Sequence, residues 1–150
     1  MADTTVKTGS GAASPGRSEL SGGTYAAADV GSHTVRLLIA RYDPIGLVVR
    51  PLHTERRITR LAGGFLPADE LGEAAMRDSI RALESYSRLA DRYRVRGTVC
   101  GATGVVRRAR NRQAFLDAIR ESTVFTPRIV SEQDEALLST KGMLGALTRP

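Results

Sequence analysis

The sequence predicts an α/β domain built on a mixed β-sheet that opens with three antiparallel strands. Strand-like and helix-like segments follow one another in the order strand, strand, strand, helix, strand, helix, strand, helix. Alternation of this kind is typical of a sheet with helices on both faces. The 150 residues are 41% hydrophobic and 25% charged, which is ordinary for a domain with a buried core.

The first 23 residues differ in composition from the rest of the chain. They are rich in Ser, Thr, Gly and Ala and have almost no large apolar residues. We therefore expect residues 1–23 to be a disordered leader and residues 24–148 to form the domain. The leader lacks the apolar stretch of a signal peptide, and no apolar run approaches the ~20 residues that cross a bilayer. We expect a cytoplasmic protein without membrane contact.

Three apolar runs, separated by two short turn-forming segments, predict the opening antiparallel strands. The runs cover residues 25–29, 34–42 and 47–52, and the turns between them contain Gly31-Ser32 and Pro44-Ile45-Gly46.

Pro67, followed by Asp69 and Glu70, predicts the start of the clearest helix, because acidic residues suit a first helical turn. Apolar and small residues then recur at three- and four-residue steps, as an amphipathic helix requires. They are Met76, Ile80, Leu83, Ser87 and Ala90.

The second half of the chain alternates strands with helices. A buried strand is predicted over residues 95–101, and Asn111 is a suitable N-cap for the helix after it. A further strand is predicted over residues 126–130. Ser131 and Asp134 then form most of a capping box for a last helix.

Asp29 ends the first strand and leads into the turn formed by Gly31, Ser32, His33 and Thr34. A glycine lets the backbone approach a phosphate closely, and successive N–H groups can bind an anion. Asp29 is suited to a Mg²⁺ ion, directly or through water. A plain hairpin turn explains the same residues.

Two further segments offer groups for phosphate chemistry. Arg107 follows the predicted strand over residues 95–101, and its planar guanidinium suits phosphate oxygens. Glu135 lies at the junction of the last strand and helix, where it is a candidate general base for water. The simpler explanations are a basic helix start on the surface and an acidic residue that favours a helix N-terminus.

The net charge is +6, which favours an anionic partner. Four arginines lie between Arg107 and Arg112, but no aromatic residue is interleaved with them, so binding to nucleic acid is not favoured. Cys100 is the only cysteine and lies in an apolar run. We expect a buried thiol rather than a nucleophile.

The order and spacing of four segments resemble the amino-terminal domain of the Ppx/GppA family of exopolyphosphatases and guanosine pentaphosphate phosphohydrolases. The segments are Ala28-Asp29-Val30-Gly31-Ser32-His33-Thr34, Thr59-Arg60-Leu61, Ala102-Thr103 through Arg107, Ala109 and Asn111, and Ile129-Val130-Ser131 through Glu135-Ala136.

The resemblance implies an actin-like, ribonuclease-H-like ATPase fold in which two domains face a cleft. In this family the amino-terminal domain supplies the first phosphate loop, here Asp29 to Thr34, and the substrates are bound with Mg²⁺. It also supplies a phosphate-binding arginine, here Arg107, and a water-activating glutamate, here Glu135. The implied substrates are inorganic polyphosphate or guanosine pentaphosphate.

Several positions differ from the family pattern: His33 for Asn, Thr34 for Ser, Ala62 for Gly, Gly104-Val105 for Ser-Ala, Glu132 for Gly and Leu137 for Arg. The Gly-rich second phosphate loop is not in the 150 residues. We therefore expect half of a phosphohydrolase site, inactive or weak alone, or else a degenerate module that binds polyphosphate or the alarmone without cleaving it. A second domain, or a homodimer formed through Met143, Leu144 and Leu147, is the expected protein partner.

Overall fold

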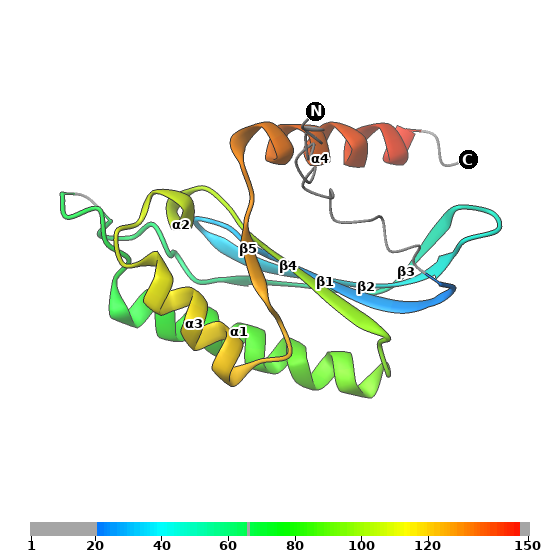
Figure 1. Cartoon of the computed structure of the whole chain (residues 1–150), viewed down its shortest axis with the longest axis horizontal. Coiled ribbons are helices and arrows are strands. Elements are labelled where there is room, and N and C mark those ends of the chain that lie inside the picture. Colours follow the sequence, from blue (N-terminus) through cyan, green and yellow to red (C-terminus); the bar gives the residue numbers. More distant parts are fainter. Residues whose placement is uncertain (1–20, 66, 148–150) are drawn as a thin grey trace, which may run out of the picture.

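The computed structural model describes residues 21–65 and 67–147, apart from the side chains of residues 140–147. In these residues a five-stranded sheet has helices on both of its sides (Figure 1), which confirms the predicted fold class. The elements in chain order are β1 (Gly23–Val30), β2 (Thr34–Asp43), β3 (Val48–Ile58), α1 (Glu73–Arg92), β4 (Gly97–Ala102), α2 (Val105–Arg108), α3 (Arg112–Ser122), β5 (Pro127–Ile129) and α4 (Glu132–Leu147).

The strands lie in the order β3-β2-β1-β4-β5. β1, β2 and β3 pair antiparallel, as predicted, while β4 pairs parallel with β1 and β5 pairs parallel with β4. The carboxyl ends of β1, β4 and β5 therefore meet at one edge of the sheet. Loops that leave such an edge are where α/β folds hold their ligands.

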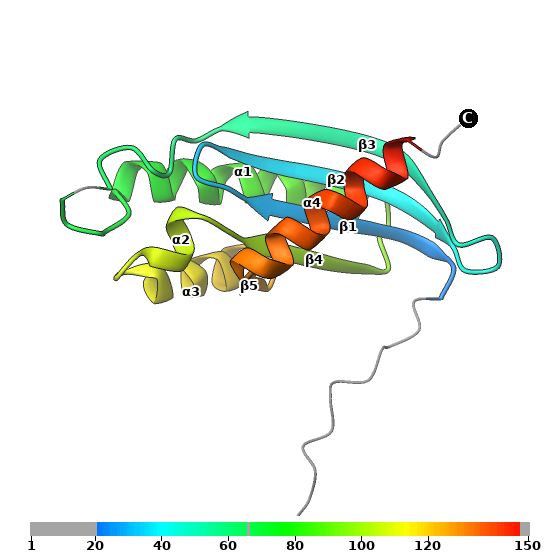
Figure 2. The same cartoon turned by 90° about the horizontal axis from the view of Figure 1, so that it is seen from above.

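One face of the sheet carries the hydrophobic core. Val30, Val35 and Ile39 are fully buried there, and α1 and α3 lie side by side against this face (Figure 1). Tyr86 of α1 is also fully buried and donates its hydroxyl hydrogen to the carbonyl oxygen of Val35 at 3.0 Å. α4 lies on the opposite face, and Figure 2 shows it crossing over the strands from β5 toward β3.

The predicted start of α1 was wrong. The helix begins at Glu73, and Asp69 and Glu70 belong to the preceding loop. Asp69 has a φ of 53°, a left-handed conformation that no helical turn accepts. Glu73 is the acidic residue that occupies the first turn.

The short helix α2 was not predicted. It occupies four residues, and Val105 and Val106 on it are fully buried. Four residues carry too little periodicity to distinguish a helical turn from a loop. Burial of the two valines fixes this turn against the core, and it brings Arg107 to the carboxyl edge of the sheet.

The two predicted caps had different outcomes. Ser131 accepts a hydrogen bond from the N–H of Asp134 at 3.1 Å, and its hydroxyl donates to the Asp134 carboxylate at 2.8 Å, so its capping role is confirmed. Asn111 is the residue before α3, but its side chain makes no cap. It binds both the N–H and the carbonyl of Leu71 at 2.9 Å, which holds the loop before α1 against α3.

Residues 1–20 of the predicted leader lie outside the described residues, and so do the side chains of Met143, Leu144 and Leu147. In the part of the chain that is described, no helix has the length and apolar character to span a membrane.

Candidate functional site

Three chain segments meet at the carboxyl edge of the sheet. They are the turn between β1 and β2, the loop after β3, and the segment that enters α2. Ser32 connects all three: its hydroxyl oxygen accepts from the N–H of Val105 at 3.2 Å, and its carbonyl accepts from the N–H of Ala62 at 2.8 Å. One side chain and its own backbone thus fix the relative positions of the three segments.

The turn over residues 31–34 is tight. Gly31 donates its N–H to the carbonyl of Thr34 at 3.0 Å, so this amide belongs to the turn. The amides of Ser32 and His33 lie at the tip of the turn and take no part in the hydrogen bond between Gly31 and Thr34. The Ser32 hydroxyl accepts from Val105 and keeps its own hydrogen for donation. The imidazole of His33 is exposed.

The loop after β3 is packed rather than solvated. Leu61 and Phe65 are buried, and the N–H groups of Thr59 and Arg60 both donate to the carbonyl of His33, at 3.0 and 3.1 Å. Among the described residues, the buried Thr59 hydroxyl has no hydrogen-bond partner. Sequence reasoning assigned no chemistry to Thr59, since only the fold shows it buried beside the turn.

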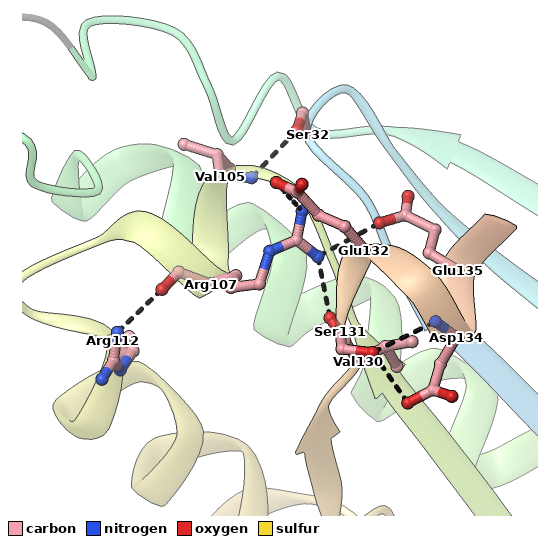
Figure 3. A network of polar contacts seen from close by, with 9 residues as sticks. All are labelled: Ser32, Val105, Arg107, Arg112, Val130, Ser131, Glu132, Asp134 and Glu135. Carbon is pink, nitrogen blue, oxygen red and sulfur yellow. Dashed lines mark hydrogen bonds and ion pairs between the residues drawn. The ribbon is translucent and has the colours of Figure 1, made fainter.

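Arg107 projects from α2 toward the start of α4 (Figure 3). Its Nη1 donates to the carbonyl of Val130 at 2.7 Å and to Oε2 of Glu135 at 3.2 Å. Its Nη2 donates to Oε1 of Glu132, also at 3.2 Å. The Arg107 carbonyl accepts from Arg112. These contacts hold the guanidinium at a defined place with 22% of the side chain exposed.

Glu132 and Glu135 lie three residues apart in the first turn of α4, and neighbours at this spacing share one face of a helix. Both therefore face Arg107. The Glu132 side chain is 81% exposed and that of Glu135 is 41% exposed. Glu132, which stands where the family pattern has Gly, brings negative charge to this region, and Arg107 carries the opposing charge.

Asp29 lies near the end of β1, on the sheet face that carries α4. Partial burial is the main cause that raises the pKa of its carboxyl group above the ordinary value of 3.8. Arg36 opposes this increase in pKa, and the negative charge of Glu135 adds to it. Asp29 is thus close enough to Glu135 for the two carboxylates to influence each other.

The carboxylate of Asp29 would suit a magnesium ion that arrives with a phosphate ligand. Mg²⁺ is commonly held by one or two carboxylates plus phosphate oxygens and water, and Asp29 supplies one such carboxylate. Among residues 21–65 and 67–139, no three His, Cys, Asp or Glu side chains cluster as a metal site. The oxygen donors present therefore suit an ion that takes its other ligands from the substrate and water, rather than an ion coordinated by protein side chains alone.

The cysteine lies apart from this chemistry. Cys100 is buried in β4, and burial, followed by the charge of Asp29, raises the pKa of its thiol to about 12. Such a thiol is not ionised near neutral pH, so the structure gives no support to a nucleophilic cysteine.

Comparisons with known proteins found relatives both by sequence and by structure. An uncharacterised protein of Streptomyces coelicolor is 40% identical over 95 residues, covering 63% of this chain and 28% of that protein. A crystal structure of the Ppx/GppA family member of Aquifex aeolicus superposes with a TM-score of 0.68 at 27% identity, over 73% of this chain and 35% of that one. The crystal structure of an exopolyphosphatase-like protein gives a TM-score of 0.72 at 24% identity, over 78% and 35%.

These neighbours have the actin-like ATPase fold that the resemblance implied. The chain spans about a third of the length of the matched structures. The model of the Ppx/GppA phosphatase family matches residues 38–149, which is most of the chain. The chain therefore belongs to the Ppx/GppA phosphatase family.

Proposed function

We propose that this chain supplies one half of a phosphohydrolase site that releases the terminal phosphate of inorganic polyphosphate or guanosine pentaphosphate. The observation that carries the proposal is the contact of Arg107 with Glu135 at 3.2 Å, beside the turn that holds Ser32. A phosphate-binding cation and a candidate base are thus adjacent to a turn that offers N–H and O–H donors.

Transfer of a phosphoryl group requires mostly positioning and neutralisation of charge. The amides of Ser32 and His33, the hydroxyls of Ser32 and Thr34, and the guanidinium of Arg107 would bind the terminal phosphate. The turn, from Gly31 to Thr34, is held rigid by its contacts with the neighbouring loops, so little reorganisation is needed when the phosphate binds.

Glu135 is the proposed general base. Its Oε2 contacts Arg107, and we assign Oε1 to the water that attacks the terminal phosphorus. The guanidinium would thus orient the phosphate and the base together. Asp29 would hold Mg²⁺, which would contribute positive charge to the phosphate oxygens when bound.

A non-catalytic polyphosphate- or alarmone-binding module is the second candidate. The ion pair of Arg107 with Glu132 favours it, because this carboxylate occupies one edge of the guanidinium that a phosphate would use. Such a module would bind the polyanion and release no phosphate.

Both candidates are tested by measuring phosphate release from polyphosphate and guanosine pentaphosphate with Mg²⁺. The chain is assayed alone and together with the product of any adjoining reading frame. If the proposal is right, Glu135→Gln lowers release by about 10²–10⁴-fold, the usual contribution of a general base, with substrate binding retained.

Glu121→Gln is the control, because it removes the same charge from the exposed far end of α3. Release that is equal in Glu135→Gln and in the wild type would exclude the assigned base. Binding without any release by the completed protein would favour the second candidate.

A further inference from the structure

A second cationic region lies on the sheet face that carries α4. An open hollow of about 730 Å³ is lined there by residues of β1, β2 and β3. Its charged residues on this face are Asp29, Arg36 and Arg56, next to Leu38 and Thr54. Since Asp29 belongs both to this hollow and to the candidate functional site, the two regions adjoin.

The register of the strands aligns these charges. Asp29 of β1 is paired directly with Arg36 of β2, which is paired directly with Arg56 of β3. Directly paired residues share a face of the sheet, and neighbouring strands lie about 4.7–4.9 Å apart. The two guanidinium groups therefore form a row that begins beside Asp29 and runs away from Arg107.

Within the described part of the chain, no carboxylate lies within ion-pair distance of Arg36 or Arg56. Arg57, which points to the other face, differs because Glu55 binds it at 3.0 Å. Like charges directly opposite each other destabilise a sheet. Both Arg36 and Arg56 are exposed, so an anion from solution can reach them and offset this repulsion.

We propose that Arg36 and Arg56 form a second phosphate subsite, which holds inner phosphates of an extended inorganic polyphosphate while Arg107 binds the terminal phosphate. This inference rests on the proposed function and deepens it. Among the described residues, no aromatic side chain lines the hollow, so these residues offer no stacking surface for a guanine base. A linear chain of phosphates can bind a row of guanidinium groups without any stacking surface.

The test compares a ligand that fills one subsite with a ligand that spans both. Binding of pyrophosphate and of long-chain polyphosphate, each with Mg²⁺, is measured by calorimetry for the wild type and for the Arg36→Gln/Arg56→Gln double variant. Long-chain polyphosphate should bind about tenfold more weakly to the variant, the order of effect expected on removing charge-assisted hydrogen bonds. Pyrophosphate should bind with little change.

The matched control is Arg41→Gln/Arg50→Gln. These two arginines are also a directly paired couple on β2 and β3, at the other end of the strands. This variant has the same net charge as the test variant and should leave binding of both ligands close to the wild type. Thermal unfolding checks that each variant folds.

Three results would overturn the subsite: an equal loss for pyrophosphate and long-chain polyphosphate, an equal loss in the control variant, or an equal loss for single-stranded DNA. The last would mean that the row binds any polyanion. If wild-type protein binds neither phosphate ligand, the proposed function fails and the subsite fails with it. If pyrophosphate binds through Arg107 and only the subsite result is negative, the proposed function stands.

Discussion

Oε1 of Glu132 lies 3.2 Å from Nη2 of Arg107, on an edge of the guanidinium that a bound phosphate would share. The protein thus carries an internal anion at its own candidate anion site. Because the Glu132 side chain is mostly exposed, it can swing into solvent when a ligand arrives. Glu132 therefore competes moderately with a phosphate for this edge of the Arg107 guanidinium.

Glu132→Gln should tighten the binding of pyrophosphate by about 1.4- to fivefold, since an exposed ion pair is typically worth about 0.2–1 kcal/mol. Calorimetric titration at low salt measures the effect. Glu121→Gln provides the same change of net charge away from the site and should have a smaller effect. Unchanged or weaker binding in Glu132→Gln would contradict the competition.

Asp29→Asn should stabilise the unliganded fold near neutral pH. Burial raises the folded-state pKa of Asp29 above its ordinary value of 3.8, so ionisation of this carboxyl group opposes folding. Its favourable contribution is fully present below the unfolded pKa and is lost as the pH rises through the raised folded pKa. The variant should therefore exceed the wild type in free energy of unfolding at neutral pH and match it below pH ~3.8.

Urea unfolding at a series of pH values measures this difference, and Asp91→Asn, at an exposed position in the last turn of α1, is the control. Asp29→Asn should also weaken the Mg²⁺-dependent part of phosphate binding. A variant that is less stable than the wild type at neutral pH would show that the charge of Asp29 supports the fold.

Gly104→Ala should destabilise the domain by about 1–3 kcal/mol, the range for a residue forced into a rare backbone region. Gly104 has a φ of 51°, and a Cβ atom placed on it would lie 2.5 Å from Oγ of Ser32. The substitution therefore strains the backbone and also displaces the hydroxyl that accepts from Val105.

Gly64→Ala separates these two effects, because Gly64 has a φ of 75° with nothing within 4 Å of its added Cβ. We expect Gly104→Ala to lower the free energy of unfolding more than Gly64→Ala does, and to weaken phosphate binding, which Gly64→Ala should preserve. Equal behaviour of the two variants in both measurements would show that the Ser32 contact has no influence.

Cys100 should resist thiol reagents in the native protein near neutral pH. Burial and a thiol pKa of about 12 leave a thiolate fraction on the order of 10⁻⁴ at pH 8. Ellman's reagent should therefore react slowly with the folded chain and rapidly in urea. Rapid reaction without denaturant would indicate that β4 opens readily.

Local sequence patterns predicted which helices and strands form more accurately than the residues at which they begin and end. The spacing of Leu83, Ser87 and Ala90 predicted the face of α1 that is buried. The start of α1 could not be predicted in this way, because acidic residues suit both a first helical turn and the loop before it. The positive φ of Asp69 decides between the two, and it depends on how the loop packs.

The candidate site depends on pairings that span long stretches of sequence. Arg107 and Glu135 are 28 residues apart, and they meet because β4 and β5 run parallel and end at the same edge. The order of the sequence motifs was enough to predict that Arg107 and Glu135 lie close together. The pairing of Arg36 with Arg56 was not predictable, because the register between β2 and β3 shifts at Ile39/Ala40, and a shift of one residue moves a side chain to the other face.

The strand order has a consequence for the synthesis of the protein. β1, β2 and β3 can pair as soon as residue 58 has left the ribosome, whereas β1 receives its parallel partner only when residues 97–102 follow. Glu132 and Glu135 emerge later still, so Arg107 is translated well before the carboxylates that neutralise it. During that interval the guanidinium of Arg107 lacks both of its carboxylate partners, so the anion-binding edge takes its final form only after α4 has been translated.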